Sequence, residues 1–133
     1  ESFGRLDVLV NNAGMYLGGS VEEFPEASWD QIIGVNLKSH FLMTKAAMPL
    51  LKESQGQIIF INSVGGKQGQ ANNSAYCASK FGLQGLADSI RIELRPFRIR
   101  VTSIFPNNMN SVGEVISSGD PKRIQLLEMS YTI

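Results

Sequence analysis

The chain alternates between short apolar runs and longer stretches in which apolar residues recur with helical spacing. The short runs cover residues 8–10, 57–61 and 99–105, and their lengths predict three strands. Residues 8–10 are too uniformly apolar for a strand with one polar face, so this strand is predicted to be buried. The helical spacing predicts one helix over residues 28–52 and another over residues 74–97. The second helix has an apolar stripe at Leu83, Leu86, Ala87, Ile90 and Leu94.

Local signals predict where these helices begin, bend and end. Ser28, with Gln31 three residues later, forms the pattern of a capping box and predicts the start of the first helix. Pro49 lies near the end of that helix and predicts a local kink. Glycines and asparagines between residues 65 and 74 predict a mobile loop before the second helix.

The order strand, helix, strand, helix, strand is typical of an α/β fold with a parallel sheet. Right-handed crossovers that continue in one direction place both helices on one face of that sheet. The opposite face and the edge of the first strand then have no partner among these elements, which predicts that further elements cover them. Residues 112–133 are weakly patterned, with a short helix predicted from Asp120 and Pro121 to Met129.

Composition limits the classes of function. Twelve basic and twelve acidic residues balance among 133, so no charge excess predicts a nucleic-acid or membrane-surface partner. The single cysteine, Cys77, excludes an internal disulfide and is compatible with a reducing compartment, so the default location is the cytoplasm. The single histidine, His40, has no second ligand at metal-binding spacing, and no metal site is predicted.

Three residues form the most informative pattern in the chain. Ser63 is followed thirteen positions later by Tyr76, and Lys80 follows four positions after the tyrosine. Residues at positions i and i+4 lie on one face of a helix, so the Lys80 ammonium is expected beside the Tyr76 phenol. A nearby positive charge stabilises a phenolate, and such a phenol can exchange a proton with a carbonyl or alcohol oxygen near neutral pH. Ser63 could hold the same oxygen.

Further motifs surround this pattern in a characteristic order. They are Asn11-Asn12-Ala13-Gly14, Val35-Asn36-Leu37, the strand ending at Asn62-Ser63, Ala75-Tyr76-Cys77-Ala78-Ser79-Lys80, and the strand ending at Phe105-Pro106. From residue 5 to residue 111 the chain resembles the short-chain dehydrogenase/reductase family. The resemblance implies a Rossmann-like, doubly wound parallel sheet, of which only the second half is present and residues 1–133 form a partial domain. It also implies an oxidoreductase that uses NAD or NADP.

The resemblance assigns a role to each residue of the catalytic pattern. Tyr76 corresponds to the acid/base, and Lys80 both stabilises its phenolate and reaches the nicotinamide ribose. Ser63 corresponds to the serine that orients the substrate. Asn36 matches the helix asparagine that holds a water molecule and links Lys80 to solvent as a proton relay.

The resemblance also implies residues that bind the cofactor, besides Tyr76 and Lys80. Ala13 and Gly14 are small and let the backbone approach the adenosine ribose. Asn11 is expected to bond backbone groups between neighbouring strands. Pro106 begins the loop over the nicotinamide. The family pattern continues with glycine and, four positions later, threonine.

This chain has Asn107 and Ser111 at those positions. Asparagine, like glycine, tolerates positive φ better than most residues, and serine keeps the hydroxyl group of threonine. The family's glycine-rich turn, which cradles the cofactor pyrophosphate, has no counterpart before Asn11. We therefore expect the chain as given to be a fragment that is inactive by itself.

Three functions compete at this stage. The first is hydride transfer to or from a small carbonyl or alcohol substrate, because residues 75–105 resemble carbonyl reductases and 3-oxoacyl carrier-protein reductases. The second is a sugar epimerase or dehydratase of the extended branch, which shares the tyrosine and lysine spacing. The third is a non-catalytic interaction module.

Residues 28–52 carry more apolar positions than one buried face needs, which predicts a homodimer or homotetramer of the full-length protein.

Overall fold

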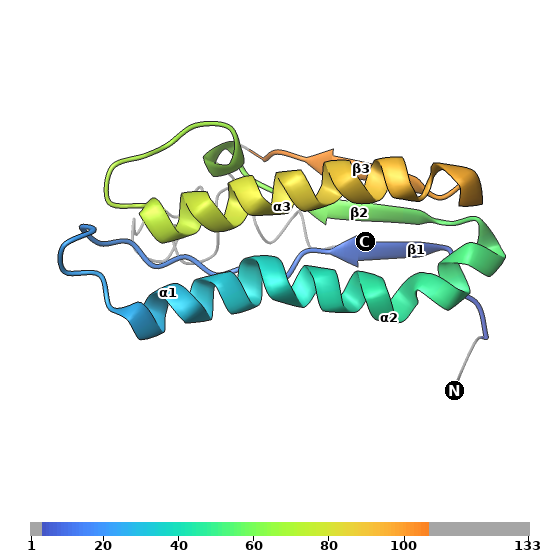
Figure 1. Cartoon of the computed structure of the whole chain (residues 1–133), viewed down its shortest axis with the longest axis horizontal. Coiled ribbons are helices and arrows are strands. Elements are labelled where there is room, and N and C mark those ends of the chain that lie inside the picture. Colours follow the sequence, from blue (N-terminus) through green and yellow to red (C-terminus); the bar gives the residue numbers. More distant parts are fainter. Residues whose placement is uncertain (1–3, 107–133) are drawn as a thin grey trace, which may run out of the picture.

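Three parallel strands form the sheet of the computed structural model, which describes residues 4–106. They are β1 (Val8–Asn11), β2 (Gln57–Ile61) and β3 (Arg100–Ile104), in the spatial order β1-β2-β3. Both neighbouring pairs run parallel, and Figure 1 shows the helices gathered on one face of the sheet. The predicted α/β fold with a parallel, Rossmann-like sheet is confirmed.

The two faces of the sheet differ in burial. Ile58 and Phe60 of β2 point toward the helices and are fully buried. On the opposite face Val8 is 47% exposed, Val10 54% and Ile104 45%. The prediction that residues 8–10 form a buried strand is therefore wrong for one face, because no element among residues 4–106 packs over Val8 and Val10.

The first helical segment begins earlier than its capping pattern predicts. Helix α1 (Glu26–Ile33) follows Pro25, and Ser28 lies inside the helix, so the predicted capping box is wrong. The backbone N–H groups of Ser28 and Trp29 both donate to the Pro25 carbonyl, which closes the first turn. Glu26 in that turn suits the positive end of the helix dipole.

A π-helical segment, rather than Pro49, interrupts the regular helix. Segment η1 (Gly34–Lys38) lies between α1 and α2 (Ser39–Ser54), and Pro49 lies inside the continuous helix α2. Helix α2 is terminated by Gln55, which follows its last residue and adopts a left-handed conformation with φ of 53°. The wider π turn coincides with Asn36, and π turns often mark functional sites.

The second long helix, α3 (Ser74–Glu93), ends before the predicted residue 97. Residues Arg95–Phe97 form the separate 3-10 turn η3 instead. Pro96 explains the change, because it lacks the N–H group that would continue the α-helical hydrogen-bond pattern. Within residues 4–106, no helix combines the length and apolar composition needed to span a bilayer.

The hydrophobic core lies between the sheet and helices α2 and α3. Its helical residues from α3 follow the predicted apolar stripe, with Leu86 packed at the margin. The core residues are Ala47, Leu51, Ile58, Phe60, Leu83, Ala87, Ile90, Leu94, Ile99 and Val101. This core fixes α3, and with it Tyr76 and Lys80, against the carboxyl end of β2.

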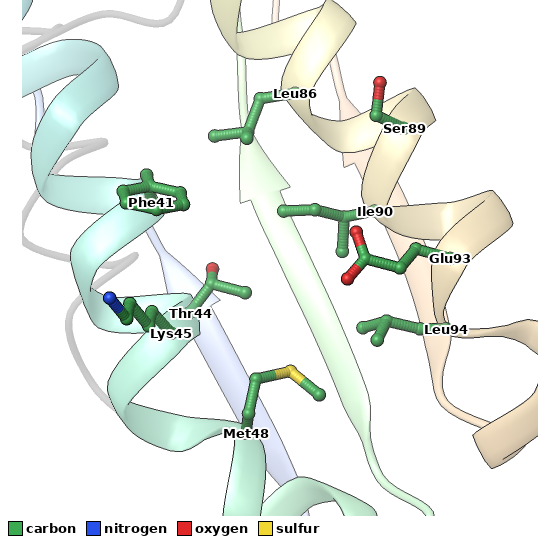
Figure 2. A pocket seen from close by; sticks show the side chains of 9 residues that line it. All are labelled: Phe41, Thr44, Lys45, Met48, Leu86, Ser89, Ile90, Glu93 and Leu94. Carbon is green, nitrogen blue, oxygen red and sulfur yellow. The ribbon is translucent and has the colours of Figure 1, made fainter.

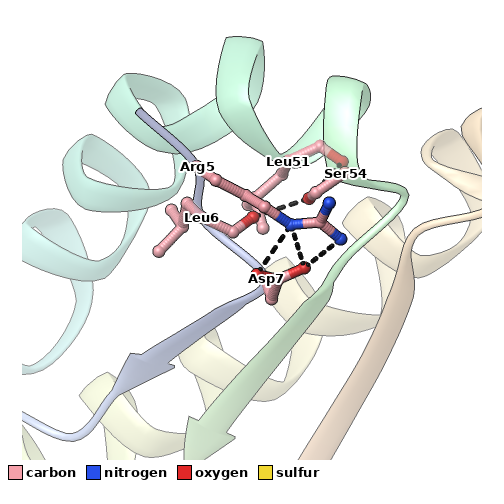
Figure 3. Close-up of polar contacts among 5 residues, drawn as sticks. All are labelled: Arg5, Leu6, Asp7, Leu51 and Ser54. Carbon is pink, nitrogen blue, oxygen red and sulfur yellow. Dashed lines mark hydrogen bonds and ion pairs between the residues drawn. The ribbon is translucent and has the colours of Figure 1, made fainter. Parts of the chain in front are cut away.

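The chain enters β1 through contacts with the end of α2 (Figure 3) and with the start of β2. The Ser54 hydroxyl donates to the Leu6 carbonyl at 2.6 Å, and the Gln57 N–H donates to the Asp7 carbonyl at 2.8 Å. A Cβ on Gly56 would lie 2.5 Å from that Asp7 oxygen, so only glycine fits there. The Arg5–Asp7 ion pair is largely exposed and contributes little to stability.

Candidate active site

The carboxyl ends of the three strands bring polar residues to one edge of the sheet. Asn11 is the last residue of β1, Ser63 lies two residues beyond β2, and Pro106 lies two residues beyond β3. In open parallel sheets this edge is where ligands bind. The sequence predicted all three of these residues as site residues, and the fold places them at the expected edge.

Ser63 and Tyr76 line the same cavity. The cavity has a volume of about 310 Å³ and is lined by Ile61, Asn62, Ser63, Val64, Gln70, Tyr76 and Pro106. Ser63 precedes the 3-10 turn η2 (Val64–Gly66), and its Oγ accepts a hydrogen bond of 3.1 Å from the Gly65 N–H. The serine keeps its own proton for donation to a ligand. A Cβ on Gly65 would lie 3.0 Å from Cε1 of Tyr76, so this glycine lets the turn pack against the tyrosine ring.

Lys80 lies one turn after Tyr76 on α3 and is almost completely buried. Its Nζ donates to the Ile61 carbonyl at 3.2 Å and lies 5.8 Å from the centroid of the Tyr76 ring. Burial lowers the pKa of Lys80 from its usual value. An ammonium has three N–H donors, and Ile61 is its one hydrogen-bond partner within residues 4–106.

Asn36 clamps the segment after β1 to helix α3. Its Oδ1 accepts from the Met15 N–H at 2.8 Å, and its Nδ2 donates to the Met15 carbonyl at 2.9 Å. The same Nδ2 donates to the Ser79 hydroxyl at 3.1 Å, and that hydroxyl donates to the Tyr76 carbonyl at 2.7 Å. The Asn36 amide therefore positions the helix turn that carries Tyr76.

Gly14 lies against both Lys80 and Asn36. A Cβ at Gly14 would lie 3.8 Å from Lys80 Nζ and 3.8 Å from Asn36 Oδ1, while Ala13 beside it is exposed. The backbone of residues 13–14 therefore presents little side-chain bulk at the edge of the sheet. A ligand can approach the backbone closely at this point.

Asn11 has a different partner from the one that the sequence predicts. Its buried Nδ2 donates to the Thr44 hydroxyl on α2 at 3.0 Å, rather than to backbone between neighbouring strands. The expected partner was wrong because the Asn11 side chain points toward the helices, where Thr44 is also buried. The bond ties the end of β1 to α2.

The Thr44→Val variant is expected to lose about 1–3 kcal/mol of unfolding free energy. Valine keeps the shape of threonine but leaves the buried Asn11 amide without its acceptor, which costs its desolvation. Urea unfolding of the full-length protein measures the loss. Thr102→Val is the control, because Thr102 is exposed. Equal effects at both positions would contradict the role of the Asn11–Thr44 bond.

A family model described as short chain dehydrogenase matches residues 1–116 of the sequence. The chain belongs to this family. The trans-4-hydroxycyclohexanecarboxylate dehydrogenase of Sinomonas cyclohexanicum is 44% identical over 111 residues, covering 84% of this chain and 43% of the relative. The D-beta-hydroxybutyrate dehydrogenase of Rhizobium meliloti is 40% identical over 107 residues, covering 80% and 42%.

Solved structures of short-chain dehydrogenases have the same fold. A short-chain dehydrogenase from Streptomyces avermitilis superimposes with a TM-score of 0.79 at 33% identity, covering 83% of this chain and 42% of that protein. Acetoin dehydrogenase from Enterobacter cloacae superimposes with a TM-score of 0.74 at 37% identity, covering 78% and 43%. The chain thus spans less than half the length of these relatives.

The structure brings four of the predicted site residues together and leaves two others outside the described part of the chain. Ser63, Tyr76 and Lys80 meet around the carboxyl end of β2, and Asn36 reaches the same helix turn through Ser79. Pro106 lines their cavity. Asn107 and Ser111, like the predicted helix from Asp120, lie outside the described residues.

Sequence reasoning missed three residues near Tyr76 as members of the candidate site: Tyr16, Gln70 and Asn73. The Tyr16 ring packs edge-on against the Tyr76 ring, with centroids 5.3 Å apart. The Tyr16 hydroxyl donates to Asn73, and Gln70 lines the cavity. Tyr16 and Asn73 are 57 residues apart in sequence, so no local spacing signals their contact.

His40 is buried near Lys80, and neither of its ring nitrogens makes a hydrogen bond within residues 4–106. Burial lowers the pKa of His40, and the charge of Lys80 lowers this pKa further, although the Asn36 and Ala13 backbones oppose both effects. The imidazole is therefore neutral at pH 7. Within residues 4–106, no three histidine, cysteine or acidic side chains group as metal ligands.

The full-length protein is expected to lose stability as the pH falls below about 6.5, because His40 is protonated more readily in the unfolded state than in the folded state. The unfolded state takes up a proton near the usual histidine pKa of 6.5, whereas the folded state resists it, so unfolding free energy declines by up to about 1.4 kcal/mol per pH unit. Urea unfolding between pH 7 and pH 5 measures the decline for the unmutated protein and for His40→Leu. Identical slopes for the two proteins would contradict the assignment.

Proposed function

We propose that the full-length protein transfers hydride between NAD or NADP and the carbon of a carbonyl or alcohol substrate. One observation carries the proposal: the Ser63 hydroxyl and the Tyr76 phenol line one cavity, with the buried Lys80 amine beside the tyrosine. Membership of the short-chain dehydrogenase family supports it, because the curated relatives are dehydrogenases and reductases. The same relatives do not favour an epimerase, a dehydratase or a non-catalytic module.

Tyr76 and Ser63 act on the same substrate oxygen in this proposal. In reduction, the Tyr76 phenol gives its proton to the carbonyl oxygen as negative charge develops there. Ser63 donates a second hydrogen bond to that oxygen, because the Gly65 N–H binds a lone pair of the hydroxyl and leaves its proton free. In oxidation, Tyr76 takes the proton from the alcohol. The Ser63 hydroxyl is held by the Gly65 N–H, and the Tyr76 ring is held by packing against Gly65 and Tyr16, so little rearrangement precedes the reaction.

Lys80 and Asn36 support the tyrosine. The Lys80 ammonium supplies a positive charge that stabilises the phenolate formed when Tyr76 gives up its proton. Asn36 is proposed to continue a proton relay from Lys80 toward solvent. Both oxygen and nitrogen of its side-chain amide already bond Met15 or Ser79, so the relay water is proposed to bind the Asn36 backbone carbonyl within the π turn.

The residues at the carboxyl edge fit a nicotinamide cofactor. Lys80 is a buried amine with donors left over after its bond to Ile61, which suits ribose hydroxyls. Gly14 and Ala13 leave the backbone open to close approach. When bound, the nicotinamide supplies or accepts the hydride. The proposed cofactor-binding residues are Asn11, Ala13, Gly14, Tyr76, Lys80, Pro106, Asn107 and Ser111.

Turnover by the full-length protein tests the proposed function. The protein is mixed with NADH or NADPH and a panel of small ketones and aldehydes, and oxidation of the reduced nicotinamide is followed by absorbance. We expect oxidation that depends on the carbonyl compound. The proposal would be contradicted by a protein that folds and binds the cofactor but does not turn it over. In that case no carbonyl compound causes oxidation of the reduced cofactor, and no alcohol causes reduction of the oxidised cofactor.

The helical face is proposed to pair with a second copy of the chain. A groove of about 230 Å³ runs between α2 and α3, and Figure 2 shows Phe41 and Met48 facing Leu86 and Ile90 across it. Phe41 is 46% exposed and its neighbour Leu42 is 49% exposed. Exposed apolar surface of this kind marks interfaces, and a two-fold dimer needs only one self-complementary patch.

Replacing Phe41 and Leu42 by glutamate is expected to dissociate the full-length dimer or tetramer into smaller species. Two charges on each copy would be buried opposite each other across the interface, which is strongly unfavourable. Light scattering at micromolar concentration measures the mass. Val21→Glu is the control, because Val21 is 83% exposed and lies outside the helices. A monomeric unmutated protein would contradict the pairing.

A further inference from the structure

Two segments that are distant in sequence meet beside the Tyr76 ring. One follows β1 and the other precedes α3, and Figure 1 shows both at the same end of the molecule. The Gly19 N–H donates to the Asn72 carbonyl at 2.8 Å, which joins the two backbones. The Tyr16 ring packs edge-on against Tyr76, so the joined segments lie directly against the proposed proton donor.

Side-chain hydrogen bonds connect these two segments to Gln70, which lines the cavity. The Tyr16 hydroxyl donates to Asn73 Oδ1 at 2.7 Å, and Asn73 Nδ2 donates to Gln70 Oε1 at 3.0 Å. A Cβ on Gly18 would lie 2.7 Å from the Tyr16 hydroxyl oxygen and 3.3 Å from Asn73 Oδ1. Gly18 therefore allows the close approach that holds Tyr16 and Asn73 together.

The direction of these bonds decides which group of Gln70 is left for a ligand. Its Oε1 is occupied by Asn73, whereas its Nε2 makes no hydrogen bond within residues 4–106. Gln70 lines the cavity together with Ser63 and Tyr76. A side-chain amide nitrogen carries two N–H donors and no acceptor. The hydrogen bonds from Tyr16 to Asn73 and from Asn73 to Gln70 thus leave the Gln70 N–H groups free to donate in the cavity that Ser63 and Tyr76 line.

We propose that Gln70 is a specificity-determining residue that donates a hydrogen bond to a second oxygen of the substrate, and that Asn73 and Tyr16 are positioning residues for it. The inference rests on the proposed function and adds a substrate class: small ketones or alcohols that carry a further keto, hydroxyl or carboxylate oxygen near the reacting carbon. No acidic side chain lines the cavity within the described part of the chain, so an anionic oxygen meets no repulsion there.

The test compares two substrates that differ in one oxygen, 2,3-butanedione and 2-butanone, in the full-length protein. We expect a higher kcat/KM for 2,3-butanedione, and a decrease in this preference of about three- to tenfold in Gln70→Leu, the effect of one neutral hydrogen bond. Gln70→Glu keeps the side-chain length and an acceptor for Asn73 but removes the donors, so it is expected to lose the preference as well. Gln68→Leu is the control, since Gln68 is also exposed, lies in the same segment and does not line the cavity.

The positioning role has its own readout. Asn73→Ala is expected to lower the preference for 2,3-butanedione, and adding it to Gln70→Leu is expected to cause no further loss. A general folding defect would instead lower kcat/KM for both substrates and leave their ratio unchanged. The Tyr16→Phe variant is expected to lower the ratio by a smaller factor, because its bond to Asn73 lies one step further from the substrate.

Two results would overturn the inference while leaving the proposed function intact. The first is an active protein that shows no preference for 2,3-butanedione over 2-butanone. The second is a preference that persists in both Gln70 variants. An absence of turnover with every carbonyl tested would instead overturn the proposed function, and this inference with it.

Discussion

Replacing Tyr76 by phenylalanine in the full-length protein is expected to lower kcat/KM by about 10²–10⁴-fold, the usual contribution of general acid–base catalysis. The substitution removes the phenolic proton and keeps the ring that packs against Tyr16 and Gly65. The loss should therefore appear in turnover and not in folding. Steady-state kinetics, together with circular dichroism and cofactor titration, separate the two.

The neighbouring tyrosine provides the matched control for this experiment. Tyr16→Phe also removes one phenolic hydroxyl, from a ring whose centroid lies 5.3 Å from that of Tyr76. Its hydroxyl is engaged with Asn73, so kcat/KM is expected to fall by less than about tenfold. Near-normal turnover by Tyr76→Phe, or equal losses in both variants, would contradict the assignment of Tyr76 as the proton donor.

Replacing Lys80 by methionine is the second change with a large expected effect. Methionine keeps the unbranched stem and removes the ammonium beside the Tyr76 ring, so we expect kcat/KM to fall by about 10²-fold or more. The pH–rate profile is expected to move to higher pH, because the positive charge that assists proton release from the phenol is gone. Kinetics across the alkaline range measure both effects.

The same substitution is not expected to destabilise the fold. Burial lowers the pKa of Lys80, which means that the folded state disfavours its charged form. Unfolding free energy in Lys80→Met is therefore expected to match or exceed that of the unmutated protein at pH 7, and urea unfolding measures it. Lys38→Met is the control because Lys38 is exposed. Activity retained in Lys80→Met would contradict the role of the ammonium.

The elements that the sequence predicted well are those set by short-range pattern. Apolar runs located the three strands within one or two residues, and the stripe on α3 identified its core-facing residues. Parallel order followed from the alternation of strands and helices, because right-handed crossovers leave few alternatives. The positions of Ser63, Tyr76 and Lys80 on these elements were therefore predictable.

The features that sequence reasoning missed depend on competition between local signals or on distant contacts. Ser28 matched a capping pattern, but Pro25 ended the preceding extended segment first and the helix began at Glu26. Asn11 found its partner 33 residues away at Thr44, on a face that only the packed fold defines. The contact between Tyr16 and Asn73 needed two loops to meet, which no periodicity encodes.

The central claim is that the full-length protein transfers hydride to a carbonyl carbon while Tyr76 supplies the proton to its oxygen. The most direct measurement uses NADH or NADPH that carries deuterium at the transferable position of the nicotinamide, with 2,3-butanedione as acceptor, and analyses the product by mass spectrometry. The account predicts that the alcohol carbon of the product carries the deuterium, and that product formation falls by about 10²–10⁴-fold in Tyr76→Phe. Product without deuterium, or product formed equally fast by Tyr76→Phe, would contradict it.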